Sequence, residues 1–237
     1  MISVRRVTRI LVEVAALRGG AFDLVPFLAV VAGHAADASG AAVVGLALTD
    51  RDGTLRPLAA SGGTAAPGRV DGVLALLAER GPHSDCAEGG RPVVRGDLGG
   101  PGGHWAAFAA GARGLGLTRV HALPLRVGEE TIGALVLLAG PGAPYAVAEV
   151  DTVRALAELT TVTVLRERRL ALAEETARQL REALESRVVV EQAKGVLAER
   201  ERITVDVAFA RLRGTARSSN RRLVDVARDV IAGVAGS

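Results

Sequence analysis

The chain has 237 residues, of which 49% are hydrophobic and only 3% aromatic, so its core must be built mainly from Ala, Val and Leu. The formal net charge is +3, and the single cysteine, Cys86, excludes an internal disulfide and any site that needs several cysteine ligands. The length suits one large domain or two modest ones. No stretch is apolar for long enough to cross a bilayer, and the charged N-terminus does not resemble a signal peptide, so we expect a cytoplasmic protein with no membrane partner.

The first region, which runs to about residue 142, alternates helical and extended stretches between glycines and prolines. Two β-hairpins are predicted, AAVVGLALTDRDGTLRPLAASG with its turn at Asp50–Gly53 and TRVHALPLRVGEETIGALVLLAG with its turn at Gly128–Glu130. RPVVRGDL is a shorter strand candidate. Helices are expected in DLVPFLAVVAGHAADASG, with Asp23 as N-cap, in RVDGVLALLAERG and at the end of GGPGGHWAAFAAGARGLGL. These elements predict an α+β domain with an antiparallel sheet and flanking helices.

The residues of this region do not assemble into a catalytic or metal-binding set. The four histidines are scattered and share no ligand spacing, and Cys86 lies in HSDCAEGG, which we expect to be flexible. The run GGPGG lacks the Lys-Ser/Thr of a phosphate loop, and Asp50–Gly53 lacks the downstream glutamate of a calcium loop. We therefore expect no catalytic residue, no metal and no bound cofactor.

The second region, about residues 146–187, has a helical period and no proline. Charged side chains surround one narrow apolar stripe, which is typical of a coiled coil. The alternative is a helix that lies on the first domain, but the stripe is longer than so small a domain could cover. We expect a homodimer through the stripe, which consists of Leu170, Ala173, Ala177, Leu180 and Leu184.

The third region contains three apolar stripes at helical spacing, which begin near Val189, Val205 and Leu223. Thr204 is expected to cap the second helix at its N-terminus, and Ser218–Asn220 are expected to break the chain and cap the third. Short amphipathic helices bury their apolar faces only by packing together, so a three-helix bundle is expected.

The basic excess lies at this end of the chain, with ten basic and six acidic residues from Ser186 onward. A basic C-terminal part of this kind indicates a polyanion partner, although ordinary surface arginines explain the same excess of basic residues. Lys194, the only lysine, precedes Gly195, and a glycine within a helix indicates close approach by a neighbouring helix or a ligand. Phe209 belongs to the apolar stripe, so no exposed aromatic ring is expected to stack on bases. The residues expected to bind the polyanion are Lys194, Arg213, Arg217, Asn220, Arg221 and Arg222.

The stretch VVVEQAKGVLAERERITVDVAFARLRGTARSSNRRLVDVARDVI resembles an ANTAR domain, the RNA-binding antitermination module of bacterial regulators. In the first region, RPVVRGDL and ALPLRVGEETIGALVLL resemble parts of a GAF sensor domain. Proteins that join the two domains are typical of actinobacteria. The pieces that match the ANTAR pattern are Glu191–Gly195, Ala208 with Phe209, Leu212 with Arg213, Ala216, Asn220, and Val226 with Ala227.

The resemblance implies a GAF-like domain over residues 1–165, a coiled-coil connector over 166–186 and an ANTAR three-helix bundle over 187–237. It implies binding to stem-loops in nascent mRNA, which stops a terminator from forming, by a dimer that sets two bundles side by side. Lys194 matches the family's Ala-Lys-Gly motif, where a compact ammonium group is not interchangeable with a guanidinium group. A small-molecule ligand of the GAF domain is a further implied partner, and its identity is unknown. The family's usual phospho-receiver domain is absent, so receiver phosphorylation is not the expected input.

Two other classes of protein remain open. A DNA-binding regulator would use the second and third helices as a helix-turn-helix, although the join RGTARSSNRR is long and polar for that motif's tight turn. A GAF-containing signalling enzyme, such as a kinase fragment, would need a phosphoacceptor-histidine helix or a nucleotide-binding domain after the first region, and neither follows.

Overall fold

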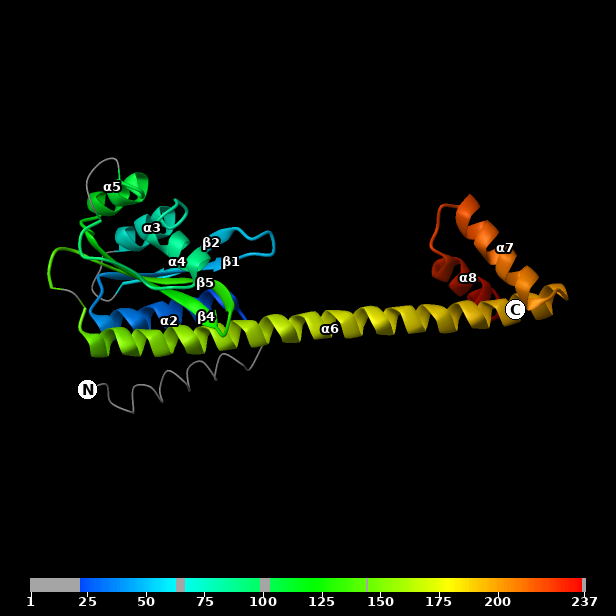
Figure 1. The fold of residues 1–237 in the computed structure, drawn as a ribbon. Helices are drawn as coiled ribbons and strands as arrows, with labels where there is room; N and C mark the ends of the chain where they lie inside the picture. The colour runs from blue at the N-terminus through cyan, green and yellow to red at the C-terminus, as the bar shows by residue number, and fades with distance from the viewer. Residues whose placement is uncertain (1–21, 63–66, 99–102, 144, 236–237) are drawn as a thin grey trace. The chain divides into compact units, whose positions relative to one another are not determined.

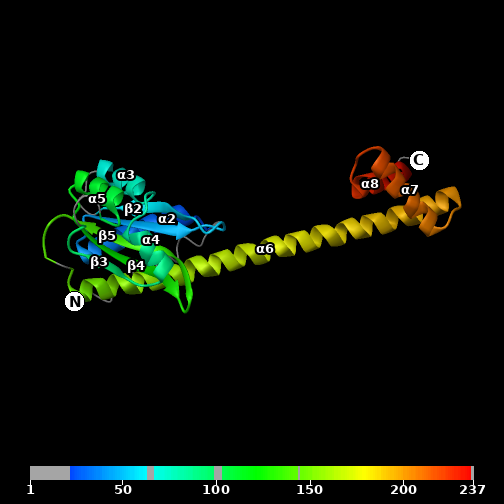
Figure 2. The same cartoon turned by 45° about the horizontal axis from the view of Figure 1, so that its top comes forward.

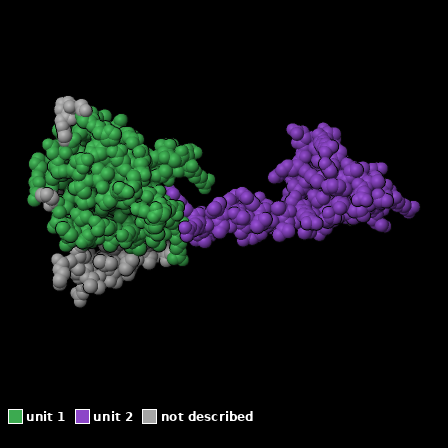
Figure 3. All heavy atoms as spheres, in the orientation of Figure 1, with its two compact units in different colours: residues 1–167 green, residues 168–237 purple. Residues whose placement is uncertain are grey.

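The computed structural model describes residues 22–62, 67–98, 103–143 and 145–235. The chain divides into two compact units, residues 1–167 and 168–237, which Figure 3 distinguishes by colour. The first unit contains a five-stranded sheet with helices on both faces, and the second is helical (Figure 1). The predicted fold class, an α+β domain with an antiparallel sheet and flanking helices followed by a long helix and a helical bundle, is confirmed.

The sheet is antiparallel throughout, in the order β2-β1-β5-β4-β3. Both predicted hairpins are present, and the predicted short strand forms one edge of the sheet. The strands are β1 (Val43–Thr49), β2 (Leu55–Ser61), β3 (Val93–Arg95), β4 (Arg119–Val127) and β5 (Glu130–Ala139).

Two residues show how the sequence fixes this sheet. In the first hairpin turn, Oδ1 of Asp50 accepts hydrogen bonds from the backbone nitrogens of Asp52 and Thr54, at 3.0 and 2.9 Å. In β5, Gly133 has φ +155°, and a Cβ there would lie 2.1 Å from the carbonyl oxygen of Ala47 on β1. Only glycine therefore permits β5 to approach β1 so closely at this position.

Helices cover the two faces of the sheet as separate layers (Figures 1 and 2). Asp23 is the N-cap of the helix that begins at Leu24, as predicted, and accepts a hydrogen bond from the backbone nitrogen of Val25 at 3.3 Å. One face packs against α2 (Leu24–Ser39) and the beginning of α6 (Val147–Glu201). The other face packs against α3 (Pro67–Leu76), α4 (Pro82–Gly89) and α5 (Ala106–Gly114).

One prediction is wrong: the segment HSDCAEGG was expected to be flexible, but it lies, up to Gly89, in the helix α4. Pro82 lies in the first turn, where its fixed φ favours a helix and its missing N–H costs nothing. The helix ends at Gly89, and the following Gly90 caps it with φ +59°. Its apolar face is only one turn long, with His83 and Cys86 buried three residues apart, which is too short to give a periodic signal in the sequence.

The helix α6 carries the chain from the first unit into the second as one uninterrupted helix of 55 residues. The predicted connector and the first helix of the predicted bundle are therefore parts of the same helix. Within the second unit, the end of α6 packs against α7 (Val205–Ser218) and α8 (Leu223–Ala235), and Thr204 caps α7 as predicted. The core of the bundle contains Val190, Ala193, Leu212, Ala216, Val226 and Ala227.

In the described ranges, no helix is both long enough and apolar enough to span a membrane.

Candidate nucleic-acid interface

Lys194 lies near the end of α6, next to the fully buried Ala193. Its Nζ atom donates to both carboxylate oxygens of Glu191, at 3.0 and 2.9 Å, and lies 5.2 Å from the centre of the Phe209 ring on α7. The side chain is only 16% exposed. The negative face of an aromatic ring attracts a cation at this distance, so the ammonium group has a defined position at the rim of the bundle.

A second cation meets the same ring. The guanidinium carbon of Arg213 lies 5.6 Å from the centre of the Phe209 ring, so α6 and α7 bring two positive charges together. Arg217 follows one turn later on the same face of α7. Neither Arg213 nor Arg217 forms an ion pair with another residue that the structure describes, so both keep donors for a ligand.

Phe209 has a role that the sequence analysis missed. It was expected inside the core stripe, but the ring is only partly buried and packs at the edge of the core. The spacing contained one signal, since Phe209 and Arg213 are four residues apart and such residues are neighbours on a helix. The contact with Lys194 joins two helices, and no local spacing could have predicted it.

Gly195 has open space beside it. A Cβ built at this position would meet no atom within 4 Å, and the residue is exposed. The expected approach of a neighbouring helix is therefore wrong for the described part of the chain, and the alternative, approach by a ligand, has room next to Lys194.

Asn220 ends α7 in the left-handed conformation, with φ +49°. Its nitrogen donates to the carbonyl oxygen of Arg217 at 3.3 Å, and the nitrogen of Arg221 donates to Ala216 at 3.0 Å, which is the Schellman pattern. Asparagine tolerates this conformation better than most residues. Asn220 therefore has a backbone role besides the base contact that was predicted for it.

The residues around Asn220 differ from their predicted roles. The hydroxyl groups of Ser218 and Ser219 donate back to the carbonyl oxygen of Thr215, at 3.1 and 2.6 Å, so these bonds close α7 and do not cap α8. The segment still breaks the chain, as predicted, because α8 begins only at Leu223.

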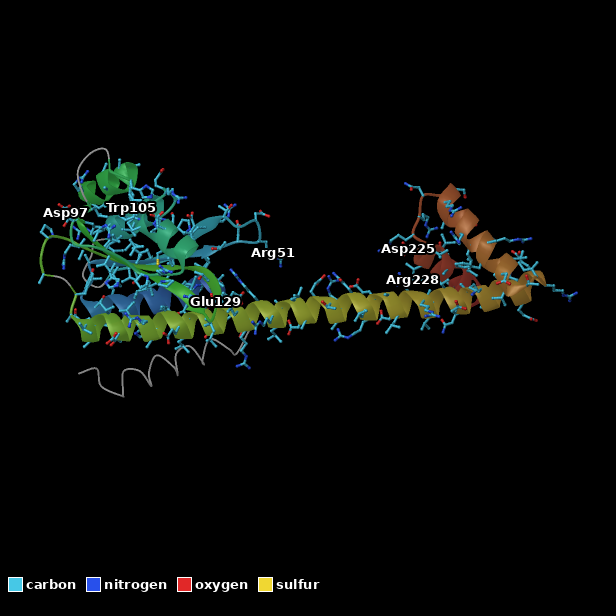
Figure 4. All side chains as sticks on the ribbon, in the orientation of Figure 1. Arg51, Asp97, Trp105, Glu129, Asp225 and Arg228 are labelled. Atoms are coloured by element: carbon cyan, nitrogen blue, oxygen red, sulfur yellow. The ribbon has the colours of Figure 1, made fainter. Side chains whose placement is uncertain are left out.

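Arg221 and Arg222 are paired with aspartates of α8. A guanidinium nitrogen of Arg221 lies 2.7 Å from a carboxylate oxygen of Asp229, and one of Arg222 lies 3.1 Å from Asp225. Asp225 also pairs with Arg228 at 3.2 Å, and Figure 4 labels these two residues. Exposed pairs of this kind contribute little stability, so a phosphate group could replace the aspartates at small cost. No contact between described residues joins either arginine to the aromatic ring.

In the first unit, His83 and Cys86 are buried and uncharged near neutral pH. Nε2 of His83 donates to the carbonyl oxygen of Leu77 at 3.0 Å, and burial lowers the pKa of His83 to about 4. Burial raises the pKa of the Cys86 thiol to about 12, so no reactive thiolate forms near neutral pH. Among the described residues, no group of three or more His, Cys, Asp and Glu side chains is arranged to hold a metal ion.

Comparison with known structures identifies the fold of the first unit. The GAF domain of a phosphoenolpyruvate-protein phosphotransferase from Coxiella burnetii is 18% identical, covers 71% of this chain and 96% of its own, and superposes with a TM-score of 0.53. The corresponding Acinetobacter domain is 14% identical, covers 72% and 99%, and has a TM-score of 0.52. The GAF domain of the cyanobacteriochrome TePixJ is 16% identical, covers 62% and 91%, and also has a TM-score of 0.52. These likenesses establish a common fold.

Two family models match the sequence. The GAF domain model matches residues 23–165, which is more than half of the chain, and the ANTAR domain model matches residues 178–231. A comparison with proteins of curated function gives no match. The ANTAR match includes the whole Lys194–Phe209–Arg213 cluster. The chain therefore belongs to the GAF domain family and carries an ANTAR domain in its C-terminal part, as its sequence predicted.

Proposed function

We propose that this protein is an RNA-binding transcription antitermination regulator, in which the GAF domain senses a signal and the ANTAR domain binds stem-loops in nascent mRNA. The observation that carries the proposal is the pair of cations, Lys194 and Arg213, that meets at Phe209 within the ANTAR match. Ammonium and guanidinium groups bind phosphate oxygens by charge-assisted hydrogen bonds. A bound stem-loop then keeps the transcript from folding into a terminator.

The positions of these groups support a division of roles. Lys194 and Arg213 hold phosphates, with a phosphate replacing Glu191 as the partner of the ammonium group, and Arg217 extends the cationic row along α7. Arg221 and Arg222 break their ion pairs with Asp229 and Asp225 and bind phosphates further along the RNA strand. Asn220 presents an exposed amide that can meet a loop base, since base contacts carry specificity and phosphate contacts carry position.

A helix-turn-helix that binds duplex DNA is the second candidate, and one observation favours it. The connection between α7 and α8 spans only residues 219–222, so it is shorter than the sequence analysis assumed and fits that motif. However, the recognition helix would be α8, whose exposed face carries Asp225 and Asp229. A recognition helix lies in the major groove between two phosphate backbones, where carboxylates on its exposed face are unfavourable, so we favour RNA.

We further propose a homodimer through the seam Leu170, Ala173, Ala177, Leu180 and Leu184 on α6. Leu170, Leu180 and Leu184 are 50%, 61% and 63% exposed in the single chain, which supports the proposal because apolar side chains at heptad spacing lose water on pairing. We propose that the protein catalyses no reaction and acts in the cytoplasm, where nascent mRNA is found.

The binding proposal is tested by competition between a hairpin RNA and a duplex DNA of the same sequence for the full-length protein. We expect hairpins to bind more tightly at every salt concentration. If the duplex displaces every hairpin offered, the helix-turn-helix proposal replaces this one.

A further inference from the structure

A cavity of about 330 Å³ lies at one edge of the GAF sheet, between β3, β4 and the first turns of α6. It is on the α2/α6 side of the sheet, because its lining residues Tyr145 and Val150 pack in that core. On the opposite face, Leu77 and Phe108 are fully buried under α3, α4 and α5, and a second cavity of about 440 Å³ lies beside α4. The edge cavity therefore lies on the other face of the sheet from the cavity beside α4.

Two polar groups of this cavity lack partners. The hydroxyl group of Tyr145 is buried and forms no hydrogen bond with any described residue. His121 is buried beside it, with the two rings 6.3 Å apart, and its ring nitrogens form no hydrogen bond within the described ranges. Burial and the positive charge of Arg154 lower the pKa of His121, so near neutral pH it offers one donor and one acceptor. Buried polar groups are normally paired, so the Tyr145 hydroxyl group is poised for a ligand, and His121 offers further hydrogen-bonding capacity beside it.

The charges of the cavity favour an anion. Arg119 lies 5.4 Å from the centre of the Tyr145 ring and donates Nε to the carbonyl oxygen of Gly140 at 2.6 Å. A further nitrogen of Arg119 donates to Ala143, so two of its five N–H groups are used. Among the described residues, Arg154 forms an ion pair only with Asp151, at 3.0 Å, and its side chain is half exposed. Arg95 also lines the cavity, but its guanidinium group lies over the Trp105 ring, 5.4 Å from the ring centre. The other two guanidinium groups and the one carboxylate, Asp151, leave a net positive charge in a partly buried site.

The size and the walls restrict the anion further. A volume of 330 Å³ corresponds to about ten water volumes, and so to roughly ten non-hydrogen atoms. Val94, Val147 and Val150 form apolar walls. A compact inorganic dianion would leave these walls uncovered and would lie near Asp151, whereas an organic carboxylate covers the valines and presents one charge.

We propose that this cavity binds a small organic carboxylate with an apolar or aromatic body of about ten non-hydrogen atoms. Its carboxylate accepts hydrogen bonds from Arg119, Arg154 and the Tyr145 hydroxyl group, and its body packs on the valines. The proposal rests on the sensor role given to the GAF domain above and names its ligand class. Because Val147, Val150 and Arg154 belong to α6, the bound carboxylate contacts the same helix that continues into the ANTAR domain.

The only tyrosine of the chain reports on the site. The full-length protein carrying ¹³C-labelled tyrosine gives one set of ring resonances, all from Tyr145. The probes are benzoate, its uncharged isostere benzamide, and inorganic phosphate. We expect benzoate to shift the Tyr145 resonances saturably and to bind at least about tenfold more tightly than either other probe, because charge-assisted hydrogen bonds to arginine are the stronger ones.

Two variants complete the test. Arg154→Gln should weaken benzoate about tenfold, whereas Arg228→Gln should not change it. The control is well matched, since Arg154 and Arg228 each pair with an aspartate three residues earlier and are 51% and 58% exposed. Tyr145→Phe keeps the ring and removes only the hydroxyl group, so calorimetry should show weaker benzoate binding by a folded protein.

Three results would overturn the proposal: benzamide or phosphate binding as tightly as benzoate, Tyr145 resonances that do not move, or equal effects of Arg154→Gln and Arg228→Gln. No RNA is present in these measurements. Failure here would therefore leave the RNA proposal standing, and loss of hairpin binding elsewhere would leave the carboxylate site standing.

Discussion

The ammonium group of Lys194 on α6 lies 5.2 Å from the centre of the Phe209 ring on α7. The contact joins two of the three helices of the bundle and places the charge beside the exposed Gly195. Packing of the ANTAR core thus fixes the position of the charge proposed to bind RNA. It also gives a physical reason why Lys194 is the only lysine among 29 lysine and arginine residues, because a compact ammonium group fits between Glu191 and the ring.

The first prediction separates the charge of Lys194 from its shape. Lys194→Gln should lower hairpin affinity about tenfold and reduce the salt slope by about one unit, because one phosphate contact is lost. Lys194→Arg should restore the slope but only part of the affinity, since a planar guanidinium group cannot occupy the same position. Affinities over a salt series decide this, and an arginine variant equal to wild type would contradict the role given to the ammonium group.

The second prediction concerns the two roles of Asn220. Asn220→Gly keeps the left-handed conformation without strain but removes the amide, so the bundle should stay folded while discrimination between loop sequences falls by roughly 1–3 kcal/mol. Asn220→Ala should in addition destabilise the bundle by about 1–2 kcal/mol. Thermal unfolding and binding to a set of loop variants measure both effects. A glycine variant that discriminates loops like wild type would show that Asn220 acts only through the backbone.

The third prediction uses the open space at Gly195. Gly195→Ala should stabilise the bundle by up to about 1 kcal/mol, because alanine is the better helix former and a Cβ meets nothing there. If RNA approaches beside Lys194, the same change should weaken hairpin binding. Unfolding and affinity are measured on one sample, and a more stable variant with unchanged affinity would place the RNA elsewhere.

The fourth prediction tests the dimer seam. Leu180→Glu combined with Leu184→Glu should convert a dimer into a monomer in analytical ultracentrifugation, because charges cannot be buried in a coiled-coil seam. The control is Leu172→Glu, since Leu172 is 65% exposed on the same helix but lies off the seam. An unchanged mass for the double variant, or a monomer from the control as well, would contradict the proposed interface.

The fifth prediction follows from the buried imidazole of His83. Its pKa is about 4 in the folded chain and about 6.5 in the unfolded chain, so the unfolded chain binds more protons between these values. The stability of the GAF unit should therefore be full above pH 6.5 and fall as the pH drops to 4, by up to about 3 kcal/mol. His83→Leu should flatten the stability of the unit over this window in chemical denaturation. A variant with the same pH dependence as wild type would assign the effect to other groups.

Much of the fold could be predicted because the relevant signals are local. The caps Asp23 and Thr204 and the hairpin turn at Asp50 depend on neighbouring residues, and the structure confirms all three. The stripe that contains Ala193, and the stripes of α7 and α8, were likewise visible as helical periodicity and form the bundle core. By contrast, α4 was missed because its buried face is one turn long.

The candidate site was predicted only in part, because its contacts are not local. The basic residue types were visible, but the meeting of Lys194 with Phe209 depends on how α6 packs against α7. By contrast, Arg222 and Asp225 are only three residues apart, and Arg221 and Asp229 eight, so these ion pairs are local and were overlooked because the sequence was read only for free basic residues.

The central claim, that the cations at Phe209 grip RNA, is tested most directly by the hairpin affinities of Arg213→Gln and Arg211→Gln. Both changes remove one exposed arginine from α7, but Arg211 lies on another face, where it pairs with Glu201. We predict that Arg213→Gln weakens hairpin binding about tenfold and lowers the salt slope by about one unit, whereas Arg211→Gln changes neither beyond its small effect on net charge. Equal losses for the two variants, or no loss for Arg213→Gln in a folded protein, would contradict the account.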